Sequence, residues 1–361
     1  MPTQRSSRQR EILHHDVVTS RGREHVREVA VAPDQPIRAT VLFVHGNCSS
    51  SAFFDPLLPT LPDDVRGLAV DLRGYGDAEQ RPVDATRGMR DYADDVLAVL
   101  DAVDAAHPLI AVAHSAGAGV VMQIGIDRPA TFDAFVLEAP MSPYGFGGTR
   151  DLDGRPLSPD FAGSGGGTAN PDFVAAIAAG DRSNDPGSPR DVLRQFYVAD
   201  PATLGDNEEM LLDSVLSTRV GDGNYPGDIV TTDSWPGVAP GTGGINNAIS
   251  PKYCDLSGFA TSGAAAPVLW IRGDVDAIVS DASMLDIANL GALGIMPGWP
   301  GQDSHPAQPM VAQMRAVLDS YAAAGGSYRE VVLPGIGHSP HLEDPKAFGS
   351  HLTDVIEACS Q

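Results

Sequence analysis

Short apolar runs that end at a glycine, a proline or a polar residue are the feature that most constrains the fold of this chain. The runs are rich in Val, Leu, Ile and Ala, as strands buried on both faces of a sheet must be. They occupy residues 39–46, 66–71, 108–115 and 133–140. Between the second and third runs, residues 89–103 place apolar side chains at helical spacing. This alternation of strands and helices predicts a parallel sheet.

The sheet pattern continues toward both ends of the chain. Residues 11–19 and 24–31 read as an antiparallel hairpin at the sheet edge. Sheet-like runs return at residues 266–274 and 327–335, and helical segments follow at 307–323 and 344–358. The predicted fold class is therefore α/β, a mostly parallel eight-stranded sheet flanked by helices.

A different composition interrupts this pattern between residues 141 and 265. The segment is rich in Gly, Pro, Asp and Asn, and it contains no strand of the sheet's type. Helical stretches are expected at 171–179, 189–199 and 206–219. We therefore predict one core domain, residues 1–140 and 266–361, and an inserted helical cap, residues 141–265.

Charge and cysteine content restrict the partners and the compartment. A net charge of −23 argues against nucleic acid or an anionic membrane as the partner. Cys48, Cys254 and Cys359 have neither metal-site spacing nor a disulfide framework, which favours a reducing compartment. No apolar leader and no long apolar stretch is visible. We expect a cytoplasmic protein with a small-molecule substrate; the sequence does not indicate an oligomeric state.

The strongest chemical signal is Ser115, at the junction of a strand and a helix. Small residues lie two positions before and two after it, Ala113 and Gly117. A nucleophile elbow needs this pattern, because bulky side chains would clash in so sharp a turn. The simpler interpretation is a serine that caps the helix.

Two backbone N–H groups are candidates for an oxyanion hole. The strand that ends at His45 and Gly46 would direct the N–H of Asn47 into the site, and the second donor would be the N–H of Ala116. Cys48 has no base at matching spacing and is expected to be a small wall residue.

A histidine after the last strand is the expected general base. His338 lies in a glycine-rich loop between that strand and the final helix, and His341 is the competing candidate. His114 directly precedes Ser115 and must point away from the nucleophile's side of the turn. We therefore expect His114 to be structural or to line the pocket.

Two carboxylates compete to orient the base. Asp276 follows the strand at 266–274 and could fix the tautomer of His338 and stabilise the imidazolium. Asp274 is expected to be a turn or surface acid. Glu138, at the end of the run at 133–140, could fill the same role from the neighbouring strand.

These motifs, in this order, resemble the α/β-hydrolase fold superfamily. The matching pieces are VLFVHGN, VDLRGYGD, AVAHSAGAG, PVLWIRGDVD and LPGIGHSPHLEDP. The resemblance implies Ser115 as nucleophile, His338 as base, Asp276 as acid, and a cap domain over the site. The chain departs from the common pattern at Ala113, where Gly is usual, and at Asp77, where Ser is usual.

A serine nucleophile favours acyl transfer, and esters or lactones have the best leaving groups. We expect hydrolysis of a neutral, apolar ester or lactone through an acyl-enzyme. The alternatives are a carbon–carbon bond hydrolase of diketone-type substrates and a slow-turnover ligand receptor. Tyr225 and Trp235 in the cap, Trp299 and His114 are the candidate substrate-binding residues.

No cofactor and no metal site is expected from the sequence. The histidines show no i, i+4 pair with a matching Glu. His14 and His15 are neighbours on a predicted edge strand, so their side chains point to opposite faces.

Overall fold

The predicted strands form one eight-stranded sheet in the computed structural model, which describes residues 10–360. The strand order is β1-β2-β4-β3-β5-β6-β13-β14. The strands are β1 (Leu13–Thr19), β2 (Gly22–Val29), β3 (Ala39–Val44), β4 (Val65–Val70), β5 (Leu109–His114), β6 (Ala134–Glu138), β13 (Val268–Gly273) and β14 (Tyr328–Leu333). β1 pairs with β2, and β2 with β4, in antiparallel fashion, whereas all other neighbours are parallel. The predicted fold class and edge hairpin are confirmed.

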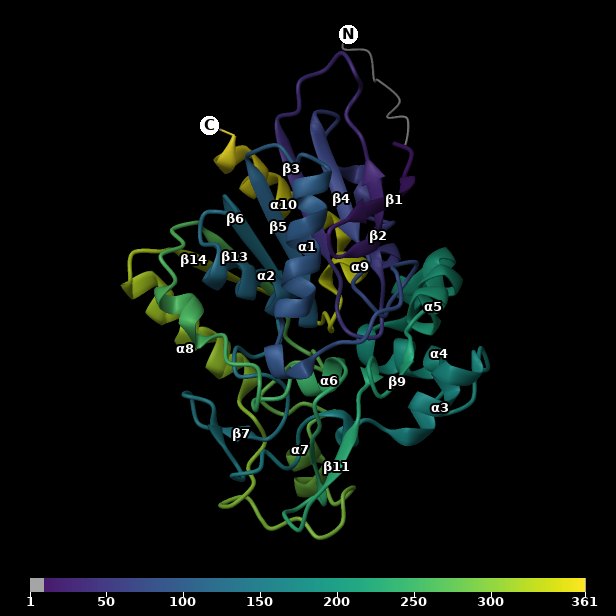
Figure 1. The fold of residues 1–361 in the computed structure, drawn as a ribbon, viewed down its shortest axis with the longest axis vertical. Helices are drawn as coiled ribbons and strands as arrows, with labels where there is room; N and C mark the ends of the chain where they lie inside the picture. Colours follow the sequence, from purple (N-terminus) through teal and green to yellow (C-terminus); the bar gives the residue numbers. More distant parts are fainter. Residues whose placement is uncertain (1–9, 361) are drawn as a thin grey trace.

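Each face of the sheet is covered by its own layer, as Figure 1 shows for α1 and α2 on one side and α10 on the other. The helices around the sheet are α1 (Arg90–Ala102), α2 (Ala116–Asp127), α8 (Met310–Ala323), α9 (Pro340–Glu343) and α10 (Pro345–Cys359), whereas α7 (Ile287–Ala292) lies beyond one end of the sheet, as β7 and β11 do (Figure 1). Within β3, Leu42 and Val44 belong to the core under α1, α2 and α8, and Val41 and Phe43 to the core under α10. Both faces are therefore apolar, which is why the run lacks polar residues.

No helix within residues 10–360 combines the length and the apolarity needed to cross a lipid bilayer.

The inserted segment adds short helices and small strand pairs beyond one end of the sheet (Figure 1). Its helices are α3 (Pro171–Ala179), α4 (Pro189–Val192), a π-helical turn (Leu193–Tyr197) that continues α4, α5 (Glu208–Leu216) and α6 (Ile245–Ala248). The strand pairs are β7 (Thr149–Arg150) with β8 (Arg155–Pro156), β9 (Val220–Gly221) with β10 (Tyr225–Pro226), and β11 (Ile229–Thr231) with β12 (Val238–Pro240). None of these strands joins the eight-stranded sheet.

The end of the inserted segment packs into the main core. The ring of Phe259 stacks on Tyr321 of α8 at 5.0 Å and meets Phe135 of β6 edge-on at 5.3 Å. A Cβ at Gly125 of α2 would lie 2.8 Å from the Phe259 ring, so this packing needs a glycine there. The division of the chain at residues 140 and 266 into core and cap stays a prediction.

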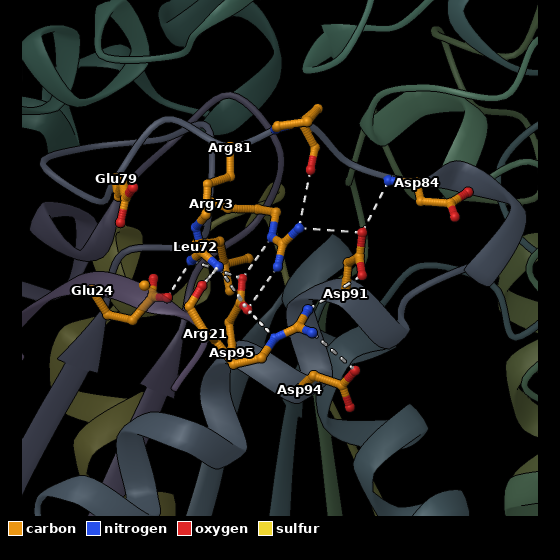
Figure 2. Close-up of polar contacts among 12 residues, drawn as sticks. Arg21, Glu24, Leu72, Arg73, Glu79, Arg81, Asp84, Asp91, Asp94 and Asp95 are labelled. Carbon is orange, nitrogen blue, oxygen red and sulfur yellow. Dashed lines mark hydrogen bonds and ion pairs between the residues drawn. The ribbon is translucent and has the colours of Figure 1, made fainter. Parts of the chain in front are cut away.

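A buried ion network ties the loop after β4 to α1 (Figure 2). Arg73 donates to both oxygens of Asp95, at 2.6 and 2.7 Å, and also lies 3.2 Å from Asp91. Its remaining guanidinium nitrogen donates to the carbonyl of Pro82 at 3.0 Å. Arg21 donates to Asp95 from the edge hairpin at 3.0 Å. The side chains of Arg73 and Asp95 are 6% and 4% exposed, so each charge is stabilised by the other rather than by water.

We expect Asp95→Asn to lower the free energy of unfolding by about 3–5 kcal/mol, because it leaves the Arg73 charge buried without its main partner. Denaturation in urea measures this loss. The matched control is Asp94→Asn, whose side chain is 39% exposed, and its cost should stay within about 1 kcal/mol. Equal losses for the two variants would contradict this account of the network.

Candidate active site

Ser115 occupies a strained turn between β5 and α2. Its φ of 55° and ψ of −120° lie in a region that residues with a side chain rarely adopt. The turn is held by its N–H, which donates to Glu138 O at 2.9 Å, and by its carbonyl, which accepts from Met141 N at 3.2 Å. A Cβ at Gly117 would lie 2.4 Å from Val44 O, and one at Gly46 would lie 2.8 Å from the Cβ of Ser115. Glycine at both positions is therefore what allows β3 and α2 to approach so closely.

His338 and Asp276 form a buried pair at the same edge of the sheet. Nδ1 of His338 lies 2.8 Å from Oδ2 of Asp276, and their side chains are 2% and 3% exposed. Oδ1 of Asp276 accepts from the N–H groups of Ile278 and Val279, at 2.8 and 2.9 Å. Because a carboxylate can only accept, Nδ1 carries the proton and Nε2 of His338 is left with its lone pair.

Glu138, the rival acid, contacts a different histidine. Its Oε1 accepts from the backbone N–H of His341 at 2.7 Å and lies 2.8 Å from Nδ1 of the same residue. Nε2 of His341 lies 3.0 Å from the carbonyl of Phe53. Both ring nitrogens of His341 thus face acceptors, Glu138 on one side and the carbonyl of Phe53 on the other. Burial opposes ionisation of Glu138, but His341 keeps the pKa of its carboxyl below the usual value.

His114 supports the loop that carries His338. Nε2 of His114 donates to the carbonyl of His338 at 2.8 Å, and the two rings lie 4.7 Å apart. Burial, with the neighbouring His338, lowers the pKa of His114 to about 3, so its imidazole is neutral at ordinary pH. The same loop is held by Glu343, which accepts from Gly337 N at 2.8 Å and from Ala199 N at 2.6 Å.

The expected oxyanion donors lie beside Ser115. Neither the N–H of Asn47 nor that of Ala116 donates a hydrogen bond to any group in the described part of the chain. Asn47 and Ser115 are partly exposed, whereas the residues on either side of each are buried. Solvent thus reaches the two positions where a carbonyl substrate would have to lie.

Residues that the sequence analysis did not single out hold the Asn47 loop in place. Tyr75 donates to Oδ1 of Asn47 at 2.7 Å, and Nδ2 of Asn47 donates to Oδ1 of Asn246, on α6, at 2.9 Å. The hydroxyl of Tyr197, in the π-helical turn, donates to the carbonyls of Asn47 and Cys48 at 3.2 and 3.0 Å. Burial raises the pKa of Tyr197 well above its usual value, so its hydroxyl remains a donor.

Tyr197 also lies near the base, with its ring 6.3 Å from that of His338 and edge-on to it. Cys48 is buried beside Asn47, and burial raises the pKa of its thiol to about 12. A thiol with so high a pKa is a poor nucleophile.

The candidate substrate-binding residues Tyr225, Trp235 and Trp299 do not all share the same neighbours. Tyr225 is buried with its ring 6.4 Å from that of Phe173, and its hydroxyl adjoins the Cys48 thiol. Trp235 and Trp299 are both tied to the segment 297–305, through Pro297 O and His305 O, each at 2.9 Å. Within residues 10–360, neither tryptophan ring is in a hydrogen bond or ring contact with Ser115 or His338. Their role in substrate binding stays a prediction.

One group of three metal-ligating side chains converges within residues 10–360, and it includes none of Ser115, Asp276 and His338. The groups described at this site are a serine, an imidazole paired with a carboxylate, and two N–H groups without an acceptor in the described residues.

Comparisons with known proteins identify the family and the fold of this chain. A profile of the alpha/beta hydrolase family matches residues 41–350. A 2-(acetamidomethylene)succinate hydrolase of Mesorhizobium japonicum is 39% identical over 80 residues, which are 22% of this chain and 27% of that protein. The chain thus matches only about a quarter of that relative's length.

Solved structures show the same fold at low sequence identity. An esterase from Rhodococcus sp. ECU1013 superposes with a TM-score of 0.58 at 17% identity, covering 96% of this chain and 99% of that one. An epoxide hydrolase gives a TM-score of 0.58 at 16% identity, with the same coverage. Because the family profile spans most of its length, this chain belongs to the alpha/beta hydrolase family.

Proposed function

We propose that this hydrolase cleaves a carboxylic ester or lactone through an acyl-enzyme formed on Ser115. The observation that carries the proposal is the 2.8 Å pair of His338 and Asp276, which leaves Nε2 of the imidazole free to accept a proton at the sheet edge where Ser115 lies. A serine beside such a base attacks carbonyl carbon, whereas a carboxylate nucleophile would be needed to open an epoxide.

In the proposed cycle, His338 Nε2 takes the proton of Ser115 as its Oγ attacks the substrate carbonyl. The resulting oxyanion accepts hydrogen bonds from the N–H groups of Asn47 and Ala116. His338 then protonates the leaving alkoxide, and a water activated by the same imidazole hydrolyses the acyl-enzyme. Asp276 keeps the imidazole in the required tautomer and stabilises its charged form.

The surroundings favour a neutral and rather apolar substrate. The side chains of Tyr75, Tyr197 and Asn246 hydrogen-bond Asn47, and none of them is a Lys or Arg. In the described residues, no Lys or Arg forms an ion pair with a residue of the proposed triad. The name of the Mesorhizobium japonicum relative denotes a dicarboxylate substrate, which would call for cationic partners. Lactone specificity, and a location in the cytoplasm, rest on the sequence alone.

We expect Ser115→Ala to lower kcat by about 10⁴-fold or more on esters and lactones, because the nucleophile is lost. A panel of p-nitrophenyl esters, lactones and β-diketones measures the rates. Ser304→Ala is the matched control, since Ser304 lies 2.9 Å from a histidine but on the surface. Activity that survives in Ser115→Ala, or a wild type that turns over only β-diketones or nothing, would overturn the proposal.

Substitutions of Asp276 and Glu138 should differ in their effects on kcat and on the free energy of unfolding. Asp276→Asn should lower kcat by about 10³–10⁴-fold with little change in KM, because His338 is no longer held in the tautomer that carries its proton on Nδ1. Glu138→Gln should mainly lower the free energy of unfolding, by about 3–5 kcal/mol, since His341 loses its buried partner. Steady-state kinetics and urea denaturation of both variants measure these effects. If Glu138→Gln alone abolished kcat in folded protein, the assignment of the acid would be wrong.

Removing the Tyr197 hydroxyl should weaken catalysis without weakening substrate binding. Tyr197→Phe frees the Asn47 and Cys48 carbonyls, so the oxyanion donor is held less firmly, and we expect kcat to fall about 10-fold with KM nearly unchanged. The inhibition constant of a boronic acid that mimics the tetrahedral intermediate should rise by a similar factor. Tyr253→Phe, in the same inserted segment, should change neither value. A rise in KM alone would contradict this role.

A further inference from the structure

Three side chains that the proposed mechanism does not use converge where β2 and the end of β4 lie side by side. His25 lies on β2, Asp71 follows β4 directly, and Asp77 lies in the loop beyond it. β2 and β4 are antiparallel neighbours, and the N–H of Asp71 donates to the carbonyl of His25 at 3.0 Å. One ligand atom from each side chain lies within 4.8 Å of the other two.

The tautomer of His25 directs a lone pair into this group. Nδ1 of His25 lies 3.2 Å from Oδ1 of Asp16, and a carboxylate can only accept, so Nδ1 carries the proton. In the neutral ring with this tautomer, Nε2 is an acceptor, and it lies 3.9 Å from Oδ2 of Asp77. His25 is only 6% exposed, and Nε2 is buried with no hydrogen-bond partner in residues 10–360. A carboxylate that orients the far nitrogen of a histidine is the usual arrangement behind a metal-ligating imidazole.

Within residues 10–360, neither Asp71 nor Asp77 forms an ion pair with a Lys or Arg side chain. Asp71 accepts from the backbone N–H groups of Ser51 and Asp77, at 2.8 and 2.9 Å, which fixes its orientation but does not neutralise its charge. The nearby guanidinium groups are paired with other acids, Arg23 with Asp16 at 2.9 Å and Arg27 with Asp55 at 2.8 Å. Three acceptors thus face one another, and a cation between them would relieve the repulsion.

We propose that His25, Asp71 and Asp77 bind one divalent transition-metal ion, of which Zn²⁺ is the representative. One imidazole with two carboxylates suits Zn²⁺ or Mn²⁺, whereas Ca²⁺ and Mg²⁺ prefer sites made of oxygen alone. Asp77, whose side chain is 70% exposed, leaves the site open for entry of the ion and for bound water.

The bound ion would join the edge hairpin to the loop after β4. That loop carries Tyr75, which donates to Asn47, so the ion would stabilise a segment next to the active site without taking part in the reaction. The proposal does not depend on the substrate or on the assignment of the triad.

Calorimetric titration of the EDTA-treated full chain with ZnCl₂, together with thermal denaturation, tests the site. We expect binding of one equivalent, and a rise in Tm of roughly 3–5 °C at about a hundred times Kd. Asp77→Ser, which changes an exposed side chain, should abolish both effects while keeping the metal-free Tm within about 1 °C of wild type. Asp101→Ser, which removes an exposed acid on α1, is the matched control and should behave as wild type.

His25→Gln provides a second test, and the visible spectrum of the Co²⁺-loaded chain should lose its imidazole-dependent bands in that variant. Failure of the wild type to bind Zn²⁺ would overturn the proposal. Binding in Asp77→Ser that equals wild type in affinity and stoichiometry would overturn it as well, because the ion would then lie elsewhere.

Discussion

The close approach of β3 to the first turn of α2 is the constraint on which the rest of the site depends. Gly117 lies so near the carbonyls of Val44 and His45 that any side chain would collide with the backbone. This contact forces Ser115 into a conformation with positive φ, at a cost of about 1–3 kcal/mol that the surrounding core must offset. It also brings the N–H groups of Asn47 and Ala116 to the same edge of the sheet. The strained backbone of Ser115 and the position of the N–H groups of Asn47 and Ala116 thus both follow from the close approach of β3 to α2.

Two carboxylates follow neighbouring strands, and the structure gives them different partners. Asp276 bonds to the ring of His338, so it affects the protonation of that imidazole directly. Glu138 bonds to the ring and backbone of His341, in the helix that follows the His338 loop. His114 adds a bond to the carbonyl of His338. The His338 loop is therefore held by His114 and, through the following helix, by the contact of Glu138 with His341. Asp276 is left to contact the ring of His338.

The sheet could be predicted from the sequence because strands buried on both faces leave unbroken apolar runs. Ser115 and His338 were predicted from local spacing around a turn and a loop, and they stay predictions. The choice between Asp276 and Glu138 stayed open, since both follow a strand at the same edge and only side-chain contacts separate them. Tyr197 and Asn246 carry no spacing signal and were missed. His25, Asp71 and Asp77 come together only through the register of β2 and β4, which no sequence pattern reveals.

The inserted segment supplies side chains that hold the Asn47 loop in this structure. Its Tyr197 holds the carbonyls of Asn47 and Cys48, and its Asn246 holds the Asn47 side chain. The carbonyls of Asn47 and Cys48 share rigid peptide units with the N–H groups of Cys48 and Ser49, so Tyr197 fixes the backbone that directly follows the Asn47 N–H. Under the proposed function, a change in the insertion that displaces Tyr197 or Asn246 therefore also shifts the Asn47 loop. Substrate selectivity and rate are then coupled through these two residues.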